Sequence, residues 1–379
     1  MGREVATTSE PGELPPRLLR RWGLPDPPDA RVEPLGRGPA GRSWRVTAGT
    51  AAFLLKEFAG VRRRQVVFRH RVTTALADRG LPVPTAIPTA PPRAAAAGDG
   101  RTLVTAAGRG YGLYPWVDGR RRGGLDLSLT QCQELGELLG RVHAALDALT
   151  PPVQQTLLVP TARAARAVAD IDRLLGDDAG GAAAGHAVPA LRERRDLLVE
   201  LADHQPPDLD TATVGYVHGD FHAGSLLYGR TRRVSAIVGW GRLAVGPYAG
   251  ELVRAAVLLF AMPDGRGLDL ERVESFVRGH AAAFPLDGGQ IQAAAHRAWW
   301  ERLCDLGGLG LGLGLGLGGA ADDVPPGGAA PGDDALVAWW TGNLDRSLDA
   351  FAAPYAAAPY AAEEEEAGAN ASAAVARAS

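Results

Sequence analysis

Cysteine is scarce in this chain of 379 residues, which contains only Cys132 and Cys304. Because the two lie far apart, we expect neither a disulfide framework nor a cysteine-based zinc site. No run of about 18 apolar residues occurs without glycine or charge, so a membrane-spanning helix is not expected. The net charge of −3 gives no sign of a nucleic-acid or membrane partner. The first residues lack the apolar core of a signal peptide, so a cytoplasmic protein is expected.

Lysine is rarer still, because Lys56 is the single lysine among 40 basic residues. Asparagine occurs only at Asn343 and Asn370, whereas alanine, glycine and arginine abound. This pattern suggests a biased coding composition, under which arginine replaces lysine wherever the two serve equally well. They are not equivalent where a compact ammonium group must lie against a phosphate. Lys56 is therefore a candidate phosphate-binding residue, with chance survival of one lysine as the alternative.

The residues that are present predict a soluble globular protein with a small lobe first. Apolar residues make up 46% and charged residues 22% of the chain, enough for one two-lobed domain or two small ones. Residues 1–30 are rich in proline and arginine and predict a poorly ordered lead-in. Residues 31–113 predict a mostly β lobe, with strands near 42–48 and 51–58. One helix follows these strands and ends at Gly80.

Residues 114–305 predict a mainly helical lobe. Its first helix should start near Thr130 as the cap and should have Leu129 on its apolar face. The other residues predicted on that face are Cys132, Leu135, Leu139, Val142 and Leu146. His143 on the same helix is expected to be a packed residue rather than a metal ligand.

The end of the chain changes in composition. The range 306–335 contains a leucine–glycine repeat and a proline–glycine-rich stretch, which predict a linker or insertion. The range 336–352 predicts a terminal helix. The alanine- and glutamate-rich range 353–379 predicts a disordered tail.

The stretch HGDFH contains three chemically capable side chains: His218, Asp220 and His222. On a strand, alternation would point all three to one face, as a metal site requires. A hydrolytic metal site needs further ligands, and the other histidines form no second cluster. A metallohydrolase is therefore the weaker of two interpretations of this stretch.

The order of the motifs supports the second interpretation, which is phosphoryl transfer. A glycine-bearing hairpin precedes Lys56, a helix follows, and an apolar strand leads into the His-Gly-Asp loop. In phosphoryl transfer the protein contributes mainly positioning and electrostatic stabilisation. That work needs a lysine on the phosphates, an aspartate for the substrate hydroxyl proton, and metal-ligating groups downstream. Lys56 suits the first role and Asp220 the second.

Residues 32 to 304 resemble the aminoglycoside phosphotransferase/choline kinase family, which has the protein-kinase-like fold. The motifs that carry the resemblance are FLLKEF around Lys56, RGLPVP at 79–84, LYPWVDGR at 113–120, LGELLGRVHAAL at 135–146 and YVHGDFHAGSLLYG at 216–229. The resemblance implies an α+β fold with a small, mostly β N-terminal lobe with one main helix. It also implies a larger, mainly helical C-terminal lobe and a hinge near 114–119.

The resemblance also assigns roles to individual residues. Asp220 would be the catalytic base, and Lys56 would hold the phosphates of ATP. Three glycines of the loop before Lys56 would contribute to the nucleotide site, namely Gly36, Gly38 and Gly41. The backbone around Tyr114 and Trp116 would meet adenine, although this stretch equally suits a buried lobe junction. Mg²⁺ is the expected metal, and His218 would support the backbone of the loop.

The sequence departs from the family pattern at the metal-binding positions. Ser225 stands where an asparagine is expected, and Gly239 stands where the metal-binding aspartate is expected. The acid that the family pattern has after the Gly-Pro turn is present as Glu251. The helix position expected to hold a glutamate paired with Lys56 falls near Arg69 and His70. Magnesium-supported catalysis would therefore require another acid, such as Glu251, as a metal ligand.

Two functions follow from the resemblance and its departures. The first is ATP-dependent phosphoryl transfer to a hydroxyl of a small molecule, with residual activity. The alternative is a pseudokinase, which keeps the fold and acts by binding a nucleotide, a ligand or a partner. Neither a nucleic-acid nor a membrane partner is expected, and the sequence leaves the oligomeric state and the substrate's identity open.

Overall fold

The computed structural model describes most of the chain. The described residues are 14–15, 17–38, 41–90, 101–151, 156–157, 161–177, 187–207, 212–263, 265–306 and 333–356. The chain divides into two compact units, of which the first combines the chain up to Arg122 with His218–Leu243. The second contains Gly123–Val217 and most of the chain from Ala244 on. Most of the predicted linker, 306–335, and of the predicted tail, 353–379, lies outside the described residues.

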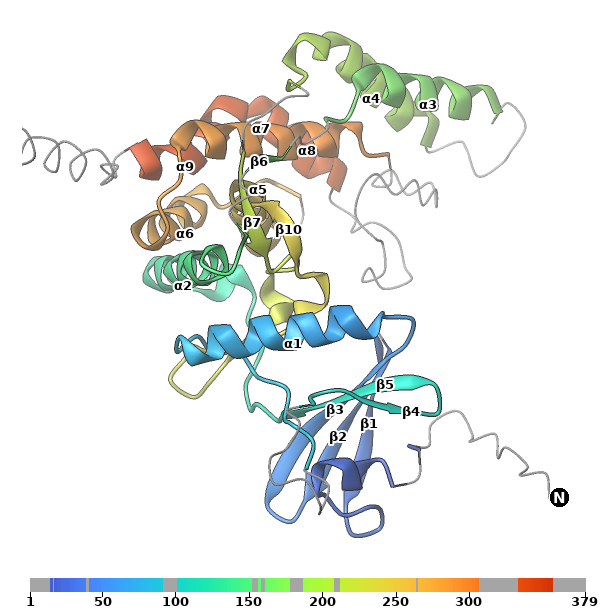
Figure 1. The fold of residues 1–379 in the computed structure, drawn as a ribbon. Helices are drawn as coiled ribbons and strands as arrows, with labels where there is room; N and C mark the ends of the chain where they lie inside the picture. The colour runs from blue at the N-terminus through green and yellow to red at the C-terminus, as the bar shows by residue number, and fades with distance from the viewer. Residues whose placement is uncertain are drawn as a thin grey trace, which may run out of the picture. The chain divides into compact units, whose positions relative to one another are not determined.

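The first unit is built on a five-stranded antiparallel sheet in the order β1-β2-β3-β5-β4, with one main helix, α1 (Figure 1). Its elements are β1 (Arg31–Gly38), β2 (Gly41–Ala48), β3 (Ala51–Phe58), α1 (Arg63–Asp78), β4 (Val104–Ala106) and β5 (Arg109–Pro115). The predicted β2–β3 hairpin and the helix after it are confirmed. Gly49 and Gly80 have φ of 58° and 76°, so both breaks fall where a left-handed residue is needed.

One face of this sheet is covered by the segment before β1. Leu18, Leu19 and Trp22 are buried against Trp44 and Leu55 of the sheet. The indole N–H of Trp22 also donates to a backbone carbonyl, at 3.1 Å. The described part of 1–30 therefore contributes to the core, which differs from the poorly ordered lead-in that its composition predicts. Burying three large side chains outweighs the weak local propensity of this proline-rich segment.

The first unit is completed by a short hairpin, β8 (Leu226–Tyr228) and β9 (Val234–Ile237). Arg120 and Tyr228 exchange two backbone hydrogen bonds, of 3.0 and 2.9 Å. The N–H of Ile237 donates to the carbonyl of Pro82 at 2.7 Å. The RGLPVP stretch and the segment after β5 thus both hold the hairpin in place.

The second unit is mainly helical, as predicted, with one small sheet in the order β10-β7-β6. Its helices are α2 (Leu129–Asp147), α3 (Ala164–Asp177), α4 (Ala187–Glu200), α5 (Tyr248–Phe260), α6 (Leu270–Ala283), α7 (Gly288–Cys304), α8 (Asp333–Gly342) and α9 (Leu344–Ala356). Its strands are β6 (Thr156–Leu157), β7 (Ala212–Val217) and β10 (Ala244–Pro247). No helix among the described residues is both long and apolar enough to cross a membrane.

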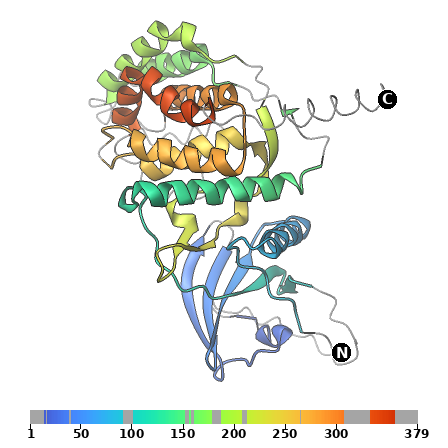
Figure 2. The same ribbon diagram turned by 90° about the vertical axis from the view of Figure 1, so that its left-hand side faces the viewer.

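Helices α2 and α6 pack closely along each other (Figure 2). Glycines make this approach possible, because a Cβ on Gly136 would lie 1.8 Å from the carbonyl oxygen of Phe276. A Cβ on Gly279 would also clash, at 1.9 Å from the carbonyl oxygen of Gln133. The two backbones therefore touch where a larger residue would separate them.

Three details of the helical unit differ from the predictions. Helix α2 is capped by Ser128 rather than Thr130, and the Ser128 hydroxyl accepts from the N–H of Gln131 at 3.2 Å. Leu129 is 43% exposed instead of lying on the buried face, because it is the first residue of the helix. The predicted terminal helix 336–352 is two helices, α8 and α9, which are separated at Asn343.

A chain of buried side chains joins four helices of the second unit. His143 Nε2 lies 2.9 Å from the carboxylate of Glu251, and its Nδ1 lies 2.8 Å from Nε2 of His280. The hydroxyl of Tyr355 contacts the other nitrogen of His280. Burial lowers the pKa of His280 well below its usual value. All four groups are satisfied when Tyr355 donates to His280, His280 to His143 and His143 to Glu251. His143 is thus a packed, hydrogen-bonded residue, as predicted.

Candidate functional site

Lys56 lies in the middle of the N-terminal sheet, on β3, opposite Ser43 of β2 and Gly112 of β5. Its side chain shares a face with that of Phe58, and its Nζ lies 5.8 Å from the centre of the Phe58 ring. Leu55 points to the opposite face and is fully buried there. The alternation of β3 therefore buries leucine on one face and presents the ammonium group on the other.

The neighbouring acid of β3, Glu57, and the acid of α1 have other partners or positions. Glu57 points to the opposite face, where its carboxylate lies 3.1 Å from Arg109 Nη1 and 3.3 Å from the Tyr111 hydroxyl. The one acid of α1 is Asp78, the last residue of the helix. At the middle of α1, where the family pattern has a glutamate, His70 is buried instead. Helix α1 therefore has no acid at the position where the family pattern pairs one with Lys56.

His70 ties α1 to the sheet. Its Nε2 lies 2.7 Å from the hydroxyl of Tyr114, and its Nδ1 lies 2.7 Å from the hydroxyl of Thr102. Burial lowers the pKa of His70 to about 4, and the charge of Arg69 adds to this effect. Burial also raises the pKa of Tyr114. The ring of His70 is therefore neutral at neutral pH and joins two neutral hydroxyls. The sequence indicated only that His70 replaces an acid, because nothing in it pairs a helix position with Tyr114.

The His-Gly-Asp loop is held by the imidazole of His218. This side chain is fully buried, and its Nε2 lies 3.0 Å from the carbonyl oxygen of Val238. Its Nδ1 accepts the backbone N–H of Asp220 at 3.1 Å. Since Nδ1 accepts, the proton must lie on Nε2, so the ring is neutral and bonded to backbone at both ends. His218 thus has the supporting contacts that the resemblance implies.

The glycine of this loop is required by geometry. Gly219 has φ of 78°, in the left-handed region. A Cβ there would lie 2.4 Å from the carbonyl oxygen of Arg242. The close approach fixes the turn between His218 and Asp220, so the direction of the Asp220 backbone is set by contacts on both sides.

The side chain of Asp220 lies beside His222. One carboxylate oxygen of Asp220 is 3.5 Å from His222 Nε2, and the two side chains are 16% and 38% exposed. Nδ1 of His222 accepts the N–H of Gly224 at 3.1 Å, which places the ring proton on Nε2, toward the carboxylate. Asp220 is thus a partly buried acid with an oriented imidazole beside it.

The arrangement does not form the metal site of the weaker interpretation. His218, Asp220 and His222 follow strand β7 in a loop rather than alternating on a strand. Both nitrogens of His218 are bonded to backbone. Among the described residues, no group of three or more His, Cys, Asp or Glu side chains is placed to hold a metal ion. The metallohydrolase interpretation is therefore wrong for this loop.

Ser225 and Gly239 lie next to each other, as two positions that share a metal would. A Cβ built on Gly239 lies 3.7 Å from Cβ of Ser225 and 3.9 Å from the ring of His218. The backbone supports this neighbourhood, because the N–H of Val238 donates to the carbonyl of Ser225 at 2.8 Å.

The residues at these two positions do not fit a magnesium ion. Gly239 offers no side-chain oxygen. The hydroxyl of Ser225 donates to the carbonyl of His222 at 2.8 Å and accepts its N–H at 3.0 Å. These two hydrogen bonds hold the turn together and leave one lone pair of the hydroxyl for any other partner. Mg²⁺ prefers carboxylates and near-ideal octahedral geometry, which this pair does not supply.

Glu251, the acid considered as a substitute, has its own role in the second unit. It is buried, and its carboxylate is bonded to His143 at 2.9 Å. Moving to a metal would break that bond in a buried environment, where an unsatisfied imidazole N–H is costly. The carboxylate of Glu251 is therefore a structural group of the helical unit.

The glycine loop before Lys56 is partly structural. Gly36 and Gly41 have φ of 118° and 137°, and Gly38 pairs with Gly41 across β1 and β2. A Cβ on Gly41 would lie 2.4 Å from the carbonyl oxygen of Glu57, so β2 can approach β3 only with glycine there. The two residues between Gly38 and Gly41 lie outside the described residues.

The segment after β5 limits how an adenine ring could bind. Pro115 has no N–H, and the N–H of Trp116 donates to the carbonyl of Ala52 at 3.1 Å. The next N–H along the chain belongs to Val117. The indole N–H of Trp116 donates to Asp118 at 3.0 Å, and its ring lies under the Arg45 guanidinium at 4.7 Å. The backbone N–H and the indole N–H of Trp116 are therefore both engaged within the first unit.

Comparison with known proteins identifies the family. The sequence model of the phosphotransferase enzyme family, abbreviated APH, matches residues 31–286, which is more than half of the chain. The chain belongs to this phosphotransferase family. No curated protein matches the chain at a significant level.

Solved structures share the protein-kinase-like fold of this family member. The aminoglycoside phosphotransferase from Alicyclobacillus acidocaldarius subsp. acidocaldarius DSM 446 superposes with a TM-score of 0.58 at 11% identity, covering 92% of this chain and 97% of that chain. The amicoumacin kinase hAmiN, in complex with AMP-PNP, Ca²⁺ and Ami, gives 0.49 at 14% identity, covering 76% and 81%. A microcompartment-associated aminopropanol kinase gives 0.48 at 15% identity, covering 89% and 96%. At 11% identity, the likeness to the first of these structures shows the fold alone.

Proposed function

We propose that the chain binds ATP and transfers its γ-phosphate slowly to a hydroxyl of a small molecule. The observation that carries this proposal is the His-Gly-Asp loop, in which His218 and Gly219 fix the backbone of Asp220 from both sides. In the first unit, Asp220 and Lys56 supply the acid and the ammonium group that phosphoryl transfer needs. Asp220 would accept the hydroxyl proton, and Lys56 would hold the phosphates.

The slow rate follows from the two metal positions. The residues present do not fit Mg²⁺, so no step of this proposal depends on a bound metal. Loss of one preorganised electrostatic group typically lowers the rate by about 10²–10³. Substrate positioning and the Asp220 carboxylate remain, so the expected activity is residual rather than absent.

A non-catalytic role is the second candidate, and the same two positions favour it. Gly239 supplies no ligand, and the Ser225 hydroxyl is engaged by the backbone of His222. A protein of this kind would bind nucleotide or a hydroxyl-bearing ligand through the retained fold without turnover.

The two candidates are separated by measuring binding and turnover together. We expect calorimetry to show ATP binding to the wild type, at least tenfold weaker binding to Lys56→Ala, and intermediate binding to Lys56→Arg, which keeps the charge. Affinity should change little between magnesium and EDTA, because the metal ligands are missing. ATP consumption that is abolished in Asp220→Asn supports slow transfer. Binding without consumption supports the second candidate, and unchanged affinity in Lys56→Ala contradicts both.

A further inference from the structure

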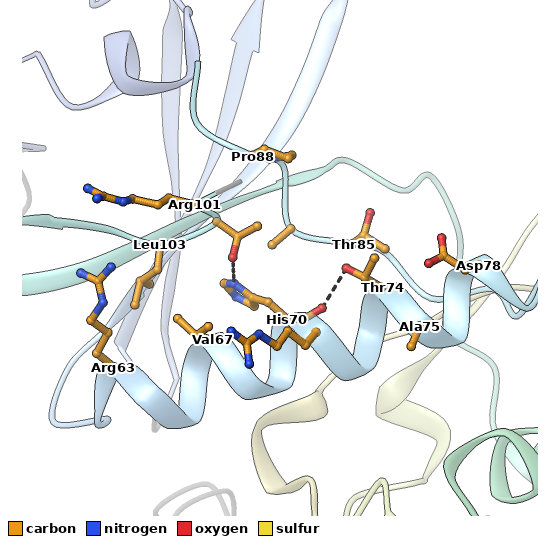
Figure 3. A pocket seen from close by; sticks show the side chains of 13 residues that line it. Arg63, Val67, His70, Thr74, Ala75, Asp78, Thr85, Pro88, Arg101 and Leu103 are labelled. Carbon is orange, nitrogen blue, oxygen red and sulfur yellow. Dashed lines mark hydrogen bonds between the residues drawn. The ribbon is translucent and has the colours of Figure 1, made fainter. Parts of the chain in front are cut away.

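A cavity of about 610 Å³ lies beside α1 in the first unit (Figure 3). One wall is a single face of the helix, because Arg63, Val67, His70, Thr74 and Asp78 follow each other at intervals of three or four residues. The other wall consists of the segments around 85–88 and 101–103. Small-molecule sites typically measure about 300–1,000 Å³, so the space suits a small ligand.

The far wall is tied to the rest of the unit. The N–H of Ile87 donates to the carbonyl of Leu113 in β5 at 2.7 Å, and that of Thr89 donates to the carbonyl of Arg101 at 2.7 Å. His70 joins α1 to Thr102 at 2.7 Å. The cavity therefore has walls that are bonded to the sheet and to each other.

The charged groups facing the cavity are mainly basic. Arg63, Arg71 and Arg101 line it, against one acid, Asp78. Arg63 and Arg101 lie toward the same end and Asp78 toward the other (Figure 3). Burial and the charge of Arg69 lower the pKa of His70 to about 4, so its ring adds no charge at neutral pH. Guanidinium groups match the geometry of phosphate and carboxylate oxygens.

We propose that this cavity binds a small organic anion. Its phosphate or carboxylate group would lie at the end of the cavity where Arg63 and Arg101 are found. Its apolar body would lie against Val67 and Leu103. Through His70, the occupied cavity would act on Tyr114. The proposal goes beyond phosphoryl transfer and requires no bound nucleotide.

The link to Tyr114 follows from the hydrogen bonds of His70. A ligand oxygen that accepts the Thr102 hydroxyl proton obliges the Thr102 oxygen to accept from His70 Nδ1. His70 Nε2 then carries no proton and accepts from the Tyr114 hydroxyl. The bound anion thus selects one of two ring tautomers and sets the direction of the bond to Tyr114.

The site is tested with phenyl phosphate, which combines an anionic group with an apolar ring. Benzoate replaces the phosphate by a carboxylate, and benzamide is the neutral match. Calorimetry on the wild type should show saturable binding of one or both anions, and at least tenfold weaker binding of benzamide. The stronger anion identifies the preferred group. No saturable binding of either anion, or equal binding of benzamide, overturns the proposal.

Paired variants separate the site from general attraction to a basic surface. Arg63→Gln with Arg101→Gln should weaken binding of the preferred anion by about tenfold or more, since both charge-assisted hydrogen bonds to the anion are lost. The control is Arg21→Gln with Arg64→Gln, which removes the same charge from exposed arginines outside the cavity. Equal weakening in both pairs contradicts a site at this place.

The link through His70 has its own readout. In protein labelled with nitrogen-15 histidine, the two ring signals of His70, identified by their loss in His70→Gln, should move on saturation with the preferred anion. Thr102→Val, studied at saturation with the anion, should show no such movement, because its hydroxyl is gone. Unchanged His70 signals in the saturated wild type contradict the link, and movement that persists in Thr102→Val contradicts its route.

Discussion

Gly239 has no side chain, but its backbone conformation suits the aspartate that the family pattern has at this position. Its φ of 87° lies in the left-handed region, which aspartate and asparagine visit more readily than other non-glycine residues. The space around its Cβ is open to ordinary contact, with Ser225 and His218 as the nearest neighbours. An aspartate at this position would therefore direct its carboxylate from a preformed turn.

We expect Gly239→Asp to fold, at a cost of no more than about 1–2 kcal/mol of unfolding free energy. Magnesium-dependent turnover should rise by about tenfold or more, because a carboxylate returns beside Ser225. Steady-state kinetics across a magnesium titration measures this gain. Gly241→Asp is the matched control, since it adds the same charge two residues away in open space. Equal kinetics in the two folded variants would contradict the assigned metal position.

Gly219 has the opposite character, because its surroundings exclude any side chain. We expect Gly219→Ala to lower the unfolding free energy by at least about 1–2 kcal/mol from its left-handed backbone alone. The approach to the carbonyl of Arg242 adds to this cost. Urea denaturation measures the loss. Gly229→Ala is the control, because its Cβ would make only ordinary contact, at 3.4 Å from Ser235. A similar loss in both variants would mean that Gly219 is not specially constrained.

The sequence predicted which residues belong to the candidate site better than it predicted the contacts between them. The spacing of Asp220, Ser225 and Gly239 follows a linear pattern, and the structure brings the last two together. The bond between His70 and Tyr114 could not be predicted, since it joins residues 44 apart in the sequence. Such contacts depend on how α1 packs on the sheet, which no local pattern specifies.

At the scale of elements, α1 depends on a buried neutral histidine. The pKa of His70 is about 4 in the fold and 6.5 in an unfolded chain. As the pH falls below about 6.5, the unfolded chain binds this proton and the fold does not, so stability is lost down to about pH 4. The pKa of His280 is also lowered, so it acts in the same direction.

We therefore expect the unfolding free energy to fall between pH 6.5 and 4, by up to about 1.4 kcal/mol per pH unit for each such histidine. His70→Gln should reduce this slope by up to about 1.4 kcal/mol per pH unit, because it removes a group whose pKa is lowered in the fold. Chemical denaturation at a series of pH values gives the slopes. An unchanged slope in His70→Gln would contradict a neutral buried ring.

Elements with strong local signals were predicted well, and those that depend on distant partners were not. The β2–β3 hairpin alternates cleanly and turns at Gly49, and α1 stops at Gly80. The cap of α2 was misplaced because Ser128 and Thr130 both suit a helix start, and only packing of the first turn decides between them. Strand β10 was missed because four residues beside β7 carry little pattern of their own.

At the scale of the whole molecule, a single lysine allows selective chemical labelling of the proposed nucleotide site. An ATP analogue with an acyl phosphate transfers its acyl group to a nearby amine. We expect one modified lysine peptide in mass spectrometry, containing Lys56, and protection by excess ATP. Lys56→Arg should show no such peptide. If an acyl phosphate without the nucleoside modifies Lys56 equally fast, the proposed nucleotide site on β3 is contradicted.

The retained turn at Gly239 also has an evolutionary consequence. A single base change can interconvert glycine and aspartate codons, and another can interconvert serine and asparagine codons. Because the backbone at Gly239 has a conformation that aspartate tolerates, and a Cβ there would lie 3.7 Å from that of Ser225, the change at position 239 does not require the surrounding backbone to adapt. A carboxylate at position 239 is therefore reachable by one substitution that the backbone tolerates, and a lineage under selection for faster turnover could acquire it.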